Sequence, residues 1–321
     1  MERSVYDLYA KATQHAESID PKHASNRVAW VLRLPDVKFG CQLPQDIPDA
    51  DYIIKIAQEC EDLGYDSVWA YDHLAPYWLR SGRALECWTL LSAVAVRTSK
   101  IRVGSLVTNT NLRNPALLAK MTSTIDCISE GRLIVGLGIG DRMSVLEMQT
   151  HGYHFPTLRQ RIDRLRDTIL TLKALWTGEN TSVRGKTFQI SNALSLPKPM
   201  QKPGPPIWIG GRNYMILDVI AELGDGWNYW GLGKKEIVAR EKYLFAKSVE
   251  AGRSQTNLVE SWAGKVDTTG QRSSNLTLAE DIQRQLLSKT TEHVNYFIAS
   301  FGRGSDRKAY EAFAEAVKSI A

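Results

Sequence analysis

The sequence predicts an α/β protein, a closed (β/α)8 TIM barrel with an insertion between the fourth helix and the fifth strand. Short apolar segments alternate with longer segments of helical periodicity, which is typical of a parallel sheet covered by helices. Eight such strand–helix pairs fit into roughly 280 residues, the usual size of a closed barrel. The clearest strands are apolar along their whole length, as expected for strands buried on both faces.

Eight segments have the composition of buried strands. In chain order they are residues 38–43, 66–71, 101–107, 133–137, 206–209, 226–229, 260–264 and 294–300. Each is followed by a segment whose apolar residues recur at helical spacing. The predicted helices are residues 48–63, 84–97, 115–128, 158–176, 214–223, 235–251, 278–290 and 306–320.

The third and fourth strands, with the helix between them, have clear boundary signals. Asn114 can cap the helix, Pro115 suits its first position, and Gly131 can end it. A right-handed crossover makes the two strands parallel, so the loops that follow them leave the sheet at the same end. Ligands bind at that end in α/β sheets and barrels, which predicts a cofactor site there.

A connection of thirty residues separates Trp176 from Ile207 and is rich in glycine, proline and polar residues. A loop of this length in a compact domain is often a functional lid. The alternative is a surface hairpin at residues 183–188 without catalytic use, and the sequence favours neither.

Composition and charge exclude several classes of protein. The net charge of +5 is spread along the chain with no basic block, so a nucleic-acid partner is not expected. No apolar stretch reaches the roughly 18 residues of a membrane span, and the charged first residues do not resemble a secretory signal. The four cysteines are far apart, which indicates reduced thiols and a cytoplasmic protein. Residues 1–37 are expected to form an N-terminal extension with a short amphipathic helix, and residues 38–321 the barrel domain.

An aspartate–histidine pair ends the second predicted strand. His73 can transfer a proton near neutral pH at this position, and Asp72 could orient its ring. A structural pair that holds the loop in place is the alternative. Tyr77 and Trp78 follow closely and could form the wall of a site for a flat ligand, although ordinary packing is the competing explanation.

Three glycines at the end of the fourth strand, Gly136, Gly138 and Gly140, lack the spacing of a dinucleotide-binding loop. Glycines at these positions are expected to let the backbone approach a flat ring or a phosphate closely. Asp141 comes next as a candidate acid, with a solvated surface residue as the alternative.

Gly210, Gly211 and Arg212 end the fifth strand and precede a helix. Backbone N–H groups, a helix N-terminus and a guanidinium together suit a phosphate, whereas a tight turn would need only one of the glycines. A metal site is not predicted, because His151 and His154 have no nearby cluster of cysteines or acids.

Several of these segments together resemble the bacterial luciferase-like monooxygenase superfamily. The matching segments are GYDSVWAYDH (64–73), LRNPALLAKMTSTIDCISEGRLIVGLGIG (112–140), HGYHFP (151–156) with Arg161, LWTG (175–178), PKPMQKPGPPIWIGG (197–211) and GDGWN (224–228). The resemblance covers residues 38–230 and implies a TIM barrel, in agreement with the strand count. Members of the superfamily use FMN or the deazaflavin coenzyme F420.

The segment VTNTNLRNPALLAKM (107–121) is more similar to the deazaflavin-dependent branch. That similarity implies a bulge with a non-prolyl cis peptide at Leu106–Val107, behind the ring. It also implies that His73 transfers a proton, and Asp141 matches a position where some members hold a catalytic glutamate. The cofactor-binding residues implied by the resemblance are Asp72, Leu106, Val107, Thr108, Asn109, Gly138, Ile139, Gly140, Gly210, Gly211 and Arg212.

The resulting hypothesis is a coenzyme F420-dependent oxidoreductase that transfers a hydride between deazaflavin C5 and a small organic substrate, with His73 handling the proton. One alternative is an FMN-dependent monooxygenase, which differs in requiring oxygen. The other is a non-catalytic barrel that binds flavin or a partner subunit. The resemblance also implies a homodimer. It fades after residue 231, so substrate contacts in that part are not assigned.

Overall fold

The computed structural model describes residues 37–76, 83–253, 258–268, 276–291, 293–302 and 306–320. Residues 34–321 form one compact unit. The predicted N-terminal helix, and the predicted wall residues Tyr77 and Trp78, lie outside the described residues. None of the helices in the described ranges is both long and apolar enough to cross a membrane.

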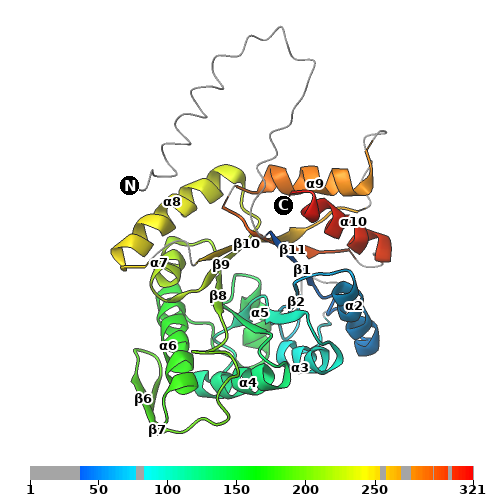
Figure 1. Ribbon diagram of the computed structural model, residues 1–321. Coiled ribbons are helices and arrows are strands. Elements are labelled where there is room, and N and C mark those ends of the chain that lie inside the picture. Colours follow the sequence, from blue (N-terminus) through cyan, green and yellow to red (C-terminus); the bar gives the residue numbers. More distant parts are fainter. Residues whose placement is uncertain are drawn as a thin grey trace, which may run out of the picture. The chain divides into compact units, whose positions relative to one another are not determined.

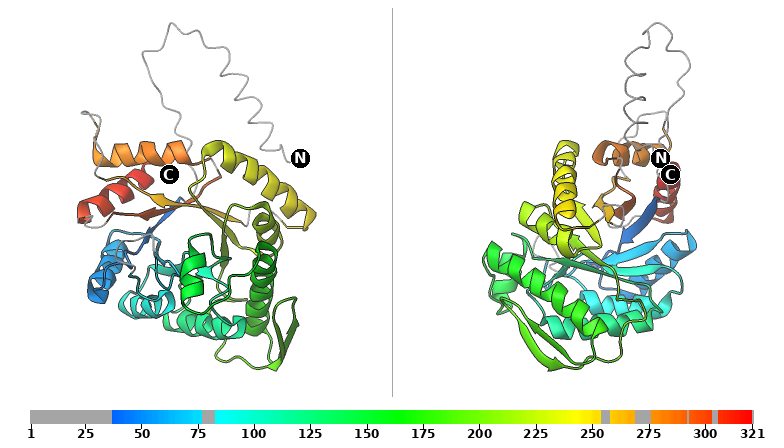
Figure 2. Two further views of the ribbon diagram at one scale, coloured as in Figure 1. Left: turned by 180° about the vertical axis from the view of Figure 1, so that it is seen from behind. Right: turned by 60° about the vertical axis from the view of Figure 1, so that its left-hand side comes forward.

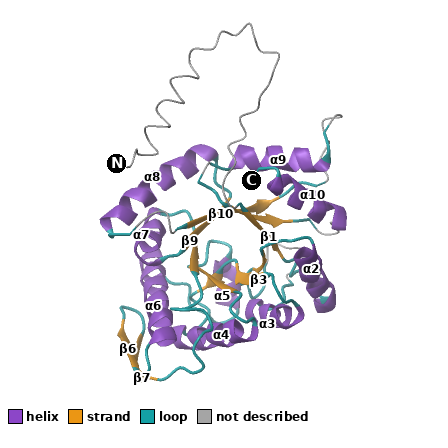
Figure 3. Cartoon of the chain, in the orientation of Figure 1, coloured by secondary structure: helices purple, strands orange, loops and turns teal. Residues whose placement is uncertain are grey.

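The strands form a closed parallel barrel, which confirms the predicted fold class (Figure 3). In chain order they are β1 (Lys38–Gln42), β2 (Ser67–Ala70), β3 (Arg102–Ser105), β4 (Thr108–Asn109), β5 (Leu133–Gly138), β8 (Ile207–Gly210), β9 (Gly226–Trp230), β10 (Val259–Lys265) and β11 (Tyr296–Ser300). The first and last strands pair in parallel and close the ring. Because β3 and β4 both pair with β5, they are two parts of one barrel strand, so the described strands occupy eight positions.

Helices surround this ring in the described part of the chain (Figures 1 and 2). They are α2 (Ala50–Asp62), α3 (Cys87–Arg97), α4 (Pro115–Ile128), α5 (Ser144–Thr150), α6 (Leu158–Thr177), α7 (Tyr214–Leu223), α8 (Lys234–Glu250), α9 (Leu278–Lys289) and α10 (Arg307–Lys318). The short helix α5 is not among the predicted ones. It lies across one end of the ring of strands, near the barrel axis, whereas the other helices lie outside the ring (Figure 3).

Local signals explain where the helices begin. Asn114 caps α4, its side-chain oxygen accepting the N–H of Ala116 at 2.8 Å, and Pro115 is the first helical residue, as predicted. Gly131 follows the end of this helix with φ +81°, a conformation that favours glycine. Thr157 begins α6 with a capping box. These boundaries depend on short-range chemistry, which is why the sequence predicts them well.

The interior of the barrel is filled by aromatic side chains at one level. The Trp208 ring lies 5.0 Å, centroid to centroid, from the rings of both Trp69 and Tyr296. Glycines face these rings: a Cβ on Gly226 would lie 2.6 Å from Trp208 Cδ1, and a Cβ on Gly104 would collide with the Trp69 ring. Large side chains therefore alternate with glycines, so that this level of the barrel is a packed core rather than a channel.

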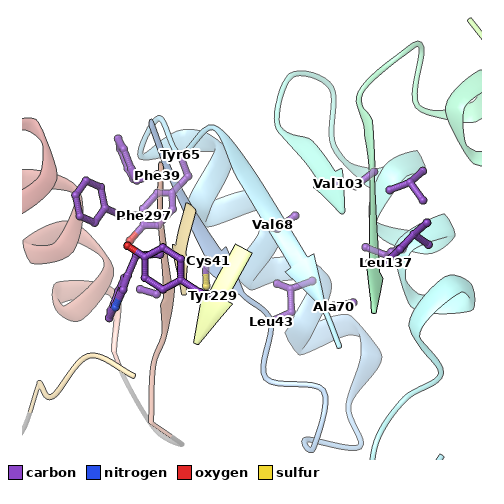
Figure 4. Close-up of a cluster of buried hydrophobic side chains, with 14 of the residues drawn as sticks. Phe39, Cys41, Leu43, Tyr65, Val68, Ala70, Val103, Leu137, Tyr229 and Phe297 are labelled. Atoms are coloured by element: carbon purple, nitrogen blue, oxygen red, sulfur yellow. The ribbon is translucent and has the colours of Figure 1, made fainter. Parts of the chain in front are cut away.

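The main core lies between the strands and the surrounding helices (Figure 4). Val68 and Leu137 are fully buried on the outer face of the barrel, and Phe39 packs against Tyr65 with ring centroids 4.7 Å apart. Successive strand residues thus point alternately into the barrel and toward the helices. Burial on both faces accounts for the continuous apolar segments in the sequence.

The long connection forms an antiparallel hairpin, β6 (Thr181–Arg184) and β7 (Gln189–Ala193), beside α6. Asp167 of α6 holds the turn: its carboxylate accepts the N–H groups of Lys186, Thr187 and Phe188. The hairpin lies at the outer edge of the molecule in Figures 1 and 2, away from the ring of strands. This position supports the predicted surface hairpin over the predicted lid.

Candidate active site

The carboxyl ends of the strands bring the predicted site residues from distant parts of the sequence together. The Asn109 N–H, in β4, donates to the carboxylate of Asp72, which follows β2, at 2.9 Å. A Cβ on Gly140, which follows β5, would lie 2.9 Å from the Asn109 side-chain nitrogen. A Cβ on Gly210, at the end of β8, would lie 2.9 Å from the Val107 side chain. Four neighbouring strand positions therefore meet at this end, as the crossover rule predicts.

Val107 is the centre of this contact region. The Leu106–Val107 peptide bond is cis, as the resemblance implied. The Val107 side chain lies between two glycines. A Cβ added to Gly138 would lie 2.5 Å from Val107 Cγ2, and a Cβ added to Gly210 would lie 2.9 Å from the same atom. Gly138 and Gly210 therefore make room for the Val107 side chain, and the expected approach of a ring to Gly138 and of a phosphate to Gly210 stays a prediction.

The residues next to Val107 are buried. Leu106 belongs to the cluster inside the barrel and is 9% exposed. Thr108 is fully buried, and its Oγ1 has no hydrogen-bond partner among the described residues. Asn109 is 3% exposed, and its side-chain oxygen accepts the backbone N–H of Asn111. An unpartnered hydroxyl at a strand end is a polar group that a ligand can satisfy.

The carboxylate that meets the His73 ring is Glu147, not Asp72. His73 Nδ1 lies 2.6 Å from Glu147 Oε1, and the Glu147 side chain is fully buried. The expectation that Asp72 orients the imidazole is therefore wrong. The backbone directs the two neighbouring side chains into different networks, since adjacent residues that leave a strand point in different directions.

Asp72 instead forms a bidentate ion pair with Arg113. The Arg113 nitrogens lie 2.5 and 2.8 Å from the two Asp72 oxygens, and Arg113 also contacts Glu86 at 2.5 Å. Burial raises the pKa of Asp72, although the positive charge of Arg113 opposes this shift. Burial by itself would lower the pKa of Arg113, but its hydrogen bonds to Asp72 and the negative charges of Asp72 and Glu86 outweigh burial and raise that pKa. Because Asp72 also accepts the Asn109 N–H, this pair holds the β4 segment against the end of β2.

Asp141 is exposed and begins the turn into α5. Its Oδ1 accepts the N–H groups of Met143 at 2.9 Å and Ser144 at 3.1 Å. The carbonyls of Ile139 and Gly140 are both within hydrogen-bond distance of the Arg161 guanidinium, at 3.3 and 2.7 Å. These contacts show how the loop after β5 is held, and a catalytic role of Asp141 stays a prediction.

The predicted phosphate segment has one donor fewer than expected. The Gly211 N–H already donates to the Asn228 carbonyl at 3.0 Å. A Cβ on Gly211 would lie 2.5 Å from Ile216 Cδ1, so this glycine is required for packing. Arg212 is exposed, and its carbonyl accepts the Nε–H of Arg240 at 2.7 Å. The Arg212 side chain and the N-terminus of α7 remain the groups that suit an anion.

Sequence reasoning missed Glu147 and Arg113, the two charged residues that hold His73 and Asp72. Glu147 lies 74 positions after His73, and α5 is too short for its periodicity to be recognised. One local signal was available, because Ser144 and Glu147 have the spacing of a capping box.

The parallel eight-position barrel is a TIM barrel, and the acid–histidine pair lies at the carboxyl ends of its strands, the end where ligands bind in this fold. The family model described as luciferase-like monooxygenase matches residues 35–271, most of the chain. The chain therefore belongs to this family.

Two curated relatives show how far the sequence similarity extends. The chain is 31% identical over 175 residues to the F420-dependent glucose-6-phosphate dehydrogenase of Amycolatopsis mediterranei (strain U-32), covering 54% of this chain and 51% of the relative. It is 32% identical over 212 residues to the F420-dependent hydroxymycolic acid dehydrogenase of Mycobacterium tuberculosis (strain ATCC 25618 / H37Rv), covering 65% and 56%. The chain thus spans about half the length of the curated relatives it matches.

Solved structures agree with the fold. An F420-dependent secondary alcohol dehydrogenase in complex with an F420–acetone adduct is similar with a TM-score of 0.78 and 16% identity, covering 89% of this chain and 99% of the other. The monooxygenase RslO1 from Streptomyces bottropensis is similar with a TM-score of 0.72 and 17% identity, covering 88% and 99%. At these identities the likeness shows the fold alone.

Proposed function

We propose that this protein is a coenzyme F420-dependent oxidoreductase that transfers a hydride between an alcohol carbon of a small organic substrate and deazaflavin C5. The observation that carries the proposal is the His73–Glu147 pair at the carboxyl end of β2, because alcohol oxidation needs a group that takes the hydroxyl proton. The relatives described above are F420-dependent dehydrogenases, which supports the cofactor and the substrate class.

The residues of the site fit a bound deazaflavin. The Val107 side chain fills the space beside Gly138 and Gly210, and an apolar side chain at this strand end suits a platform behind a planar ring. The buried Thr108 Oγ1 lacks a partner among the described residues and could bond a ring heteroatom. Arg212 is exposed at the N-terminus of α7, where it would hold the phosphate. When bound, the cofactor supplies the hydride acceptor or donor.

The chain itself orients the reactants and handles the proton. As the substrate carbon loses its hydride, the hydroxyl proton goes to the His73 imidazole, and the carbonyl product forms without a net charge on oxygen. The buried Glu147 carboxylate stabilises the imidazolium that results. Asp72 and Arg113 hold Asn109 in place. The segment of Val107 and β4, called the β4 platform below, therefore keeps a constant distance from His73. Asp141 is kept as a second candidate for proton transfer.

An FMN-dependent monooxygenase is the second candidate, and the matched family, whose description is luciferase-like monooxygenase, favours it. The two functions differ in oxygen use: the first enzyme turns over anaerobically with F420, and the second does not. Titration of the protein with each cofactor, followed by fluorescence quenching, tests the assignment. We expect tight binding of F420 and anaerobic turnover, and oxygen-dependent turnover with FMN alone would contradict the proposal. A protein that binds neither cofactor would support the non-catalytic alternative.

Replacing His73 with alanine tests the assigned role of this residue. We expect turnover with F420 to fall roughly 100-fold or more, because a positioned acid–base group contributes about that much. The Kd of the cofactor should stay within about threefold. His154→Ala is the matched control, since this histidine is exposed. Equal losses in turnover and affinity, or unchanged turnover, would contradict the role.

The proposal extends to the assembly. A homodimer is expected from the resemblance, and sedimentation equilibrium of the purified chain measures it directly. A monomer at concentrations where the protein is active would show that one subunit suffices.

A further inference from the structure

We propose that Glu147 is a positioning residue that selects the tautomer of His73 and fixes the orientation of its ring. The inference rests on the proposed proton-transfer role of His73 and adds a partner that the sequence did not suggest. Glu147 touches neither substrate nor cofactor in this scheme and acts through the imidazole.

The geometry indicates that Glu147 is an ionised acceptor. Its Oε1 lies 2.6 Å from His73 Nδ1, and its Oε2 accepts the backbone N–H of Ala75 at 3.2 Å. One proton must lie between Nδ1 and Oε1; the proposal places it on Nδ1, so that both carboxylate oxygens accept hydrogen bonds. The side chain is fully buried, which strengthens its electrostatic effect on the ring.

Helix α5 holds Glu147 at a constant place relative to the rest of the site. Met148, the next residue, accepts the Asn109 side-chain N–H at its sulfur at 3.5 Å. Asp141 anchors the start of the helix through the N–H groups of Met143 and Ser144. Helix α5 thus contacts both His73, through Glu147, and Asn109 of the β4 platform, through Met148. It lies across the end of the barrel in Figure 3.

The contact decides the form of the ring. A carboxylate at Nδ1 requires the proton on Nδ1, so Nε2 is the basic nitrogen of the neutral imidazole. Other titratable groups lie near the pair. The Tyr71 ring is 5.8 Å from that of His73, and Nδ1 of His151 contacts the backbone carbonyl of Glu147. Asp72, the neighbour of His73, is paired with Arg113.

The test combines NMR of the protein without cofactor and kinetics of the F420-loaded protein. In ¹⁵N-histidine-labelled wild-type protein, assigned with the His73→Ala variant, we expect His73 as the Nδ1–H tautomer at high pH. In Glu147→Gln we expect this preference to be lost, and maximal turnover should fall roughly 10- to 100-fold.

Controls separate positioning from simple loop support. Glu61→Gln removes another carboxylate that accepts backbone N–H groups, here of Ser99 and Lys100, and should change neither the His73 tautomer nor turnover. Glu147→Asp retains a carboxylate and should keep the Nδ1–H tautomer of His73 while turnover falls.

The outcomes are distinguishable. An Nε2–H tautomer in wild-type protein, or an unchanged tautomer and turnover in Glu147→Gln while His73→Ala is severely impaired, would overturn the role of Glu147 and leave the proposed function intact. Unimpaired His73→Ala would overturn the proposed function itself. If Glu147→Gln fails to fold, the His73 tautomer in wild-type protein and in Glu147→Asp still decides.

Discussion

At the scale of single residues, the site separates two neighbours that the sequence presents as a pair. Asp72 and His73 look like an oriented aspartate–histidine motif, but each bonds a different charged residue, Arg113 and Glu147. Such networks are sensitive to the loss of one partner, because the remaining buried charge is left without compensation. The His73 ring therefore contacts a residue of α5 rather than its neighbour in the chain.

The contact between Gly138 and Val107 provides a prediction at this scale. In Gly138→Ala the new Cβ would lie 2.5 Å from Val107 Cγ2, so the platform must shift. We expect the free energy of unfolding to fall by about 1–3 kcal/mol, the usual cost of overpacking, and the Kd for cofactor to rise roughly tenfold. Urea denaturation and fluorescence titration measure the two effects.

A double variant shows whether Val107 is the cause. Gly138→Ala combined with Val107→Ala removes the colliding methyl groups, so the combined loss of stability should be smaller than the sum of the single losses by about 1 kcal/mol. Gly302→Ala, where nothing lies within 4 Å of the added Cβ, serves as the control. Additive losses would refute the steric explanation.

At the scale of elements, the sequence predicts what depends on local patterns and misses what depends on distant contacts. The strands of the barrel are predictable because burial on both faces leaves a continuous apolar signal, as in residues 133–137 of β5. The start of α4 is predictable from Asn114 and Pro115. Helix α5 has only seven residues, and what matters about it is that Glu147 meets a histidine 74 positions earlier. No spacing rule contains that contact.

The β6–β7 hairpin provides a second prediction, concerning Asp167. The carboxylate of Asp167 accepts three backbone N–H groups of the turn and the Thr187 hydroxyl, and it is 4% exposed. In Asp167→Ala we expect amide exchange in residues 181–193 to accelerate roughly 10- to 100-fold, because buried donors lose their acceptor. Exchange in β10 should not change, and turnover should stay within about twofold, since the hairpin lies at the outer edge.

A neighbouring aspartate supplies the matched control. Asp163 contacts Lys186 and Arg159 through ion pairs in which both cations are exposed, so Asp163→Ala should change hairpin exchange very little. A large loss of turnover in Asp167→Ala, with the barrel still folded, would favour the lid interpretation of this connection.

At the scale of the whole molecule, the barrel separates packing from chemistry along its axis. Aromatic rings and glycines fill one level of the interior, while charged side chains gather at the carboxyl ends of the strands. Buried acids also occur outside the site. Glu260 of β10 and Glu241 of α8 are 4% and 5% exposed, and the Thr291 hydroxyl donates to Glu241. Such a pair makes stability depend on pH when the folded and unfolded states bind different numbers of protons.

The Glu241–Glu260 pair leads to a prediction for the whole domain. Burial, reinforced by the negative charge of Glu241, raises the pKa of Glu260 to about 8. Above about pH 4.5 the unfolded chain releases a proton that Glu260 keeps in the native state. The free energy of unfolding therefore has its full value below that pH, as far as this group is concerned, and falls as the pH rises toward 8. In this window one retained proton costs up to about 1.4 kcal/mol per pH unit.

Glu260→Gln removes the titration and keeps a neutral side chain of similar shape, so its free energy of unfolding relative to wild type should rise steadily between about pH 5 and 8. Urea denaturation measures the free energy of unfolding of both proteins, and the difference between the two values is the relevant quantity. Other groups also make stability depend on pH, since the pKa of Asp66 and Asp72 is raised and that of Glu61 is lowered, but they do so equally in both proteins. Glu179→Gln, with an exposed side chain, should give a difference that does not depend on pH. A flat difference for Glu260→Gln as well would mean that the buried pair is not protonated in the native state, and the carboxylates would then need another source of compensation.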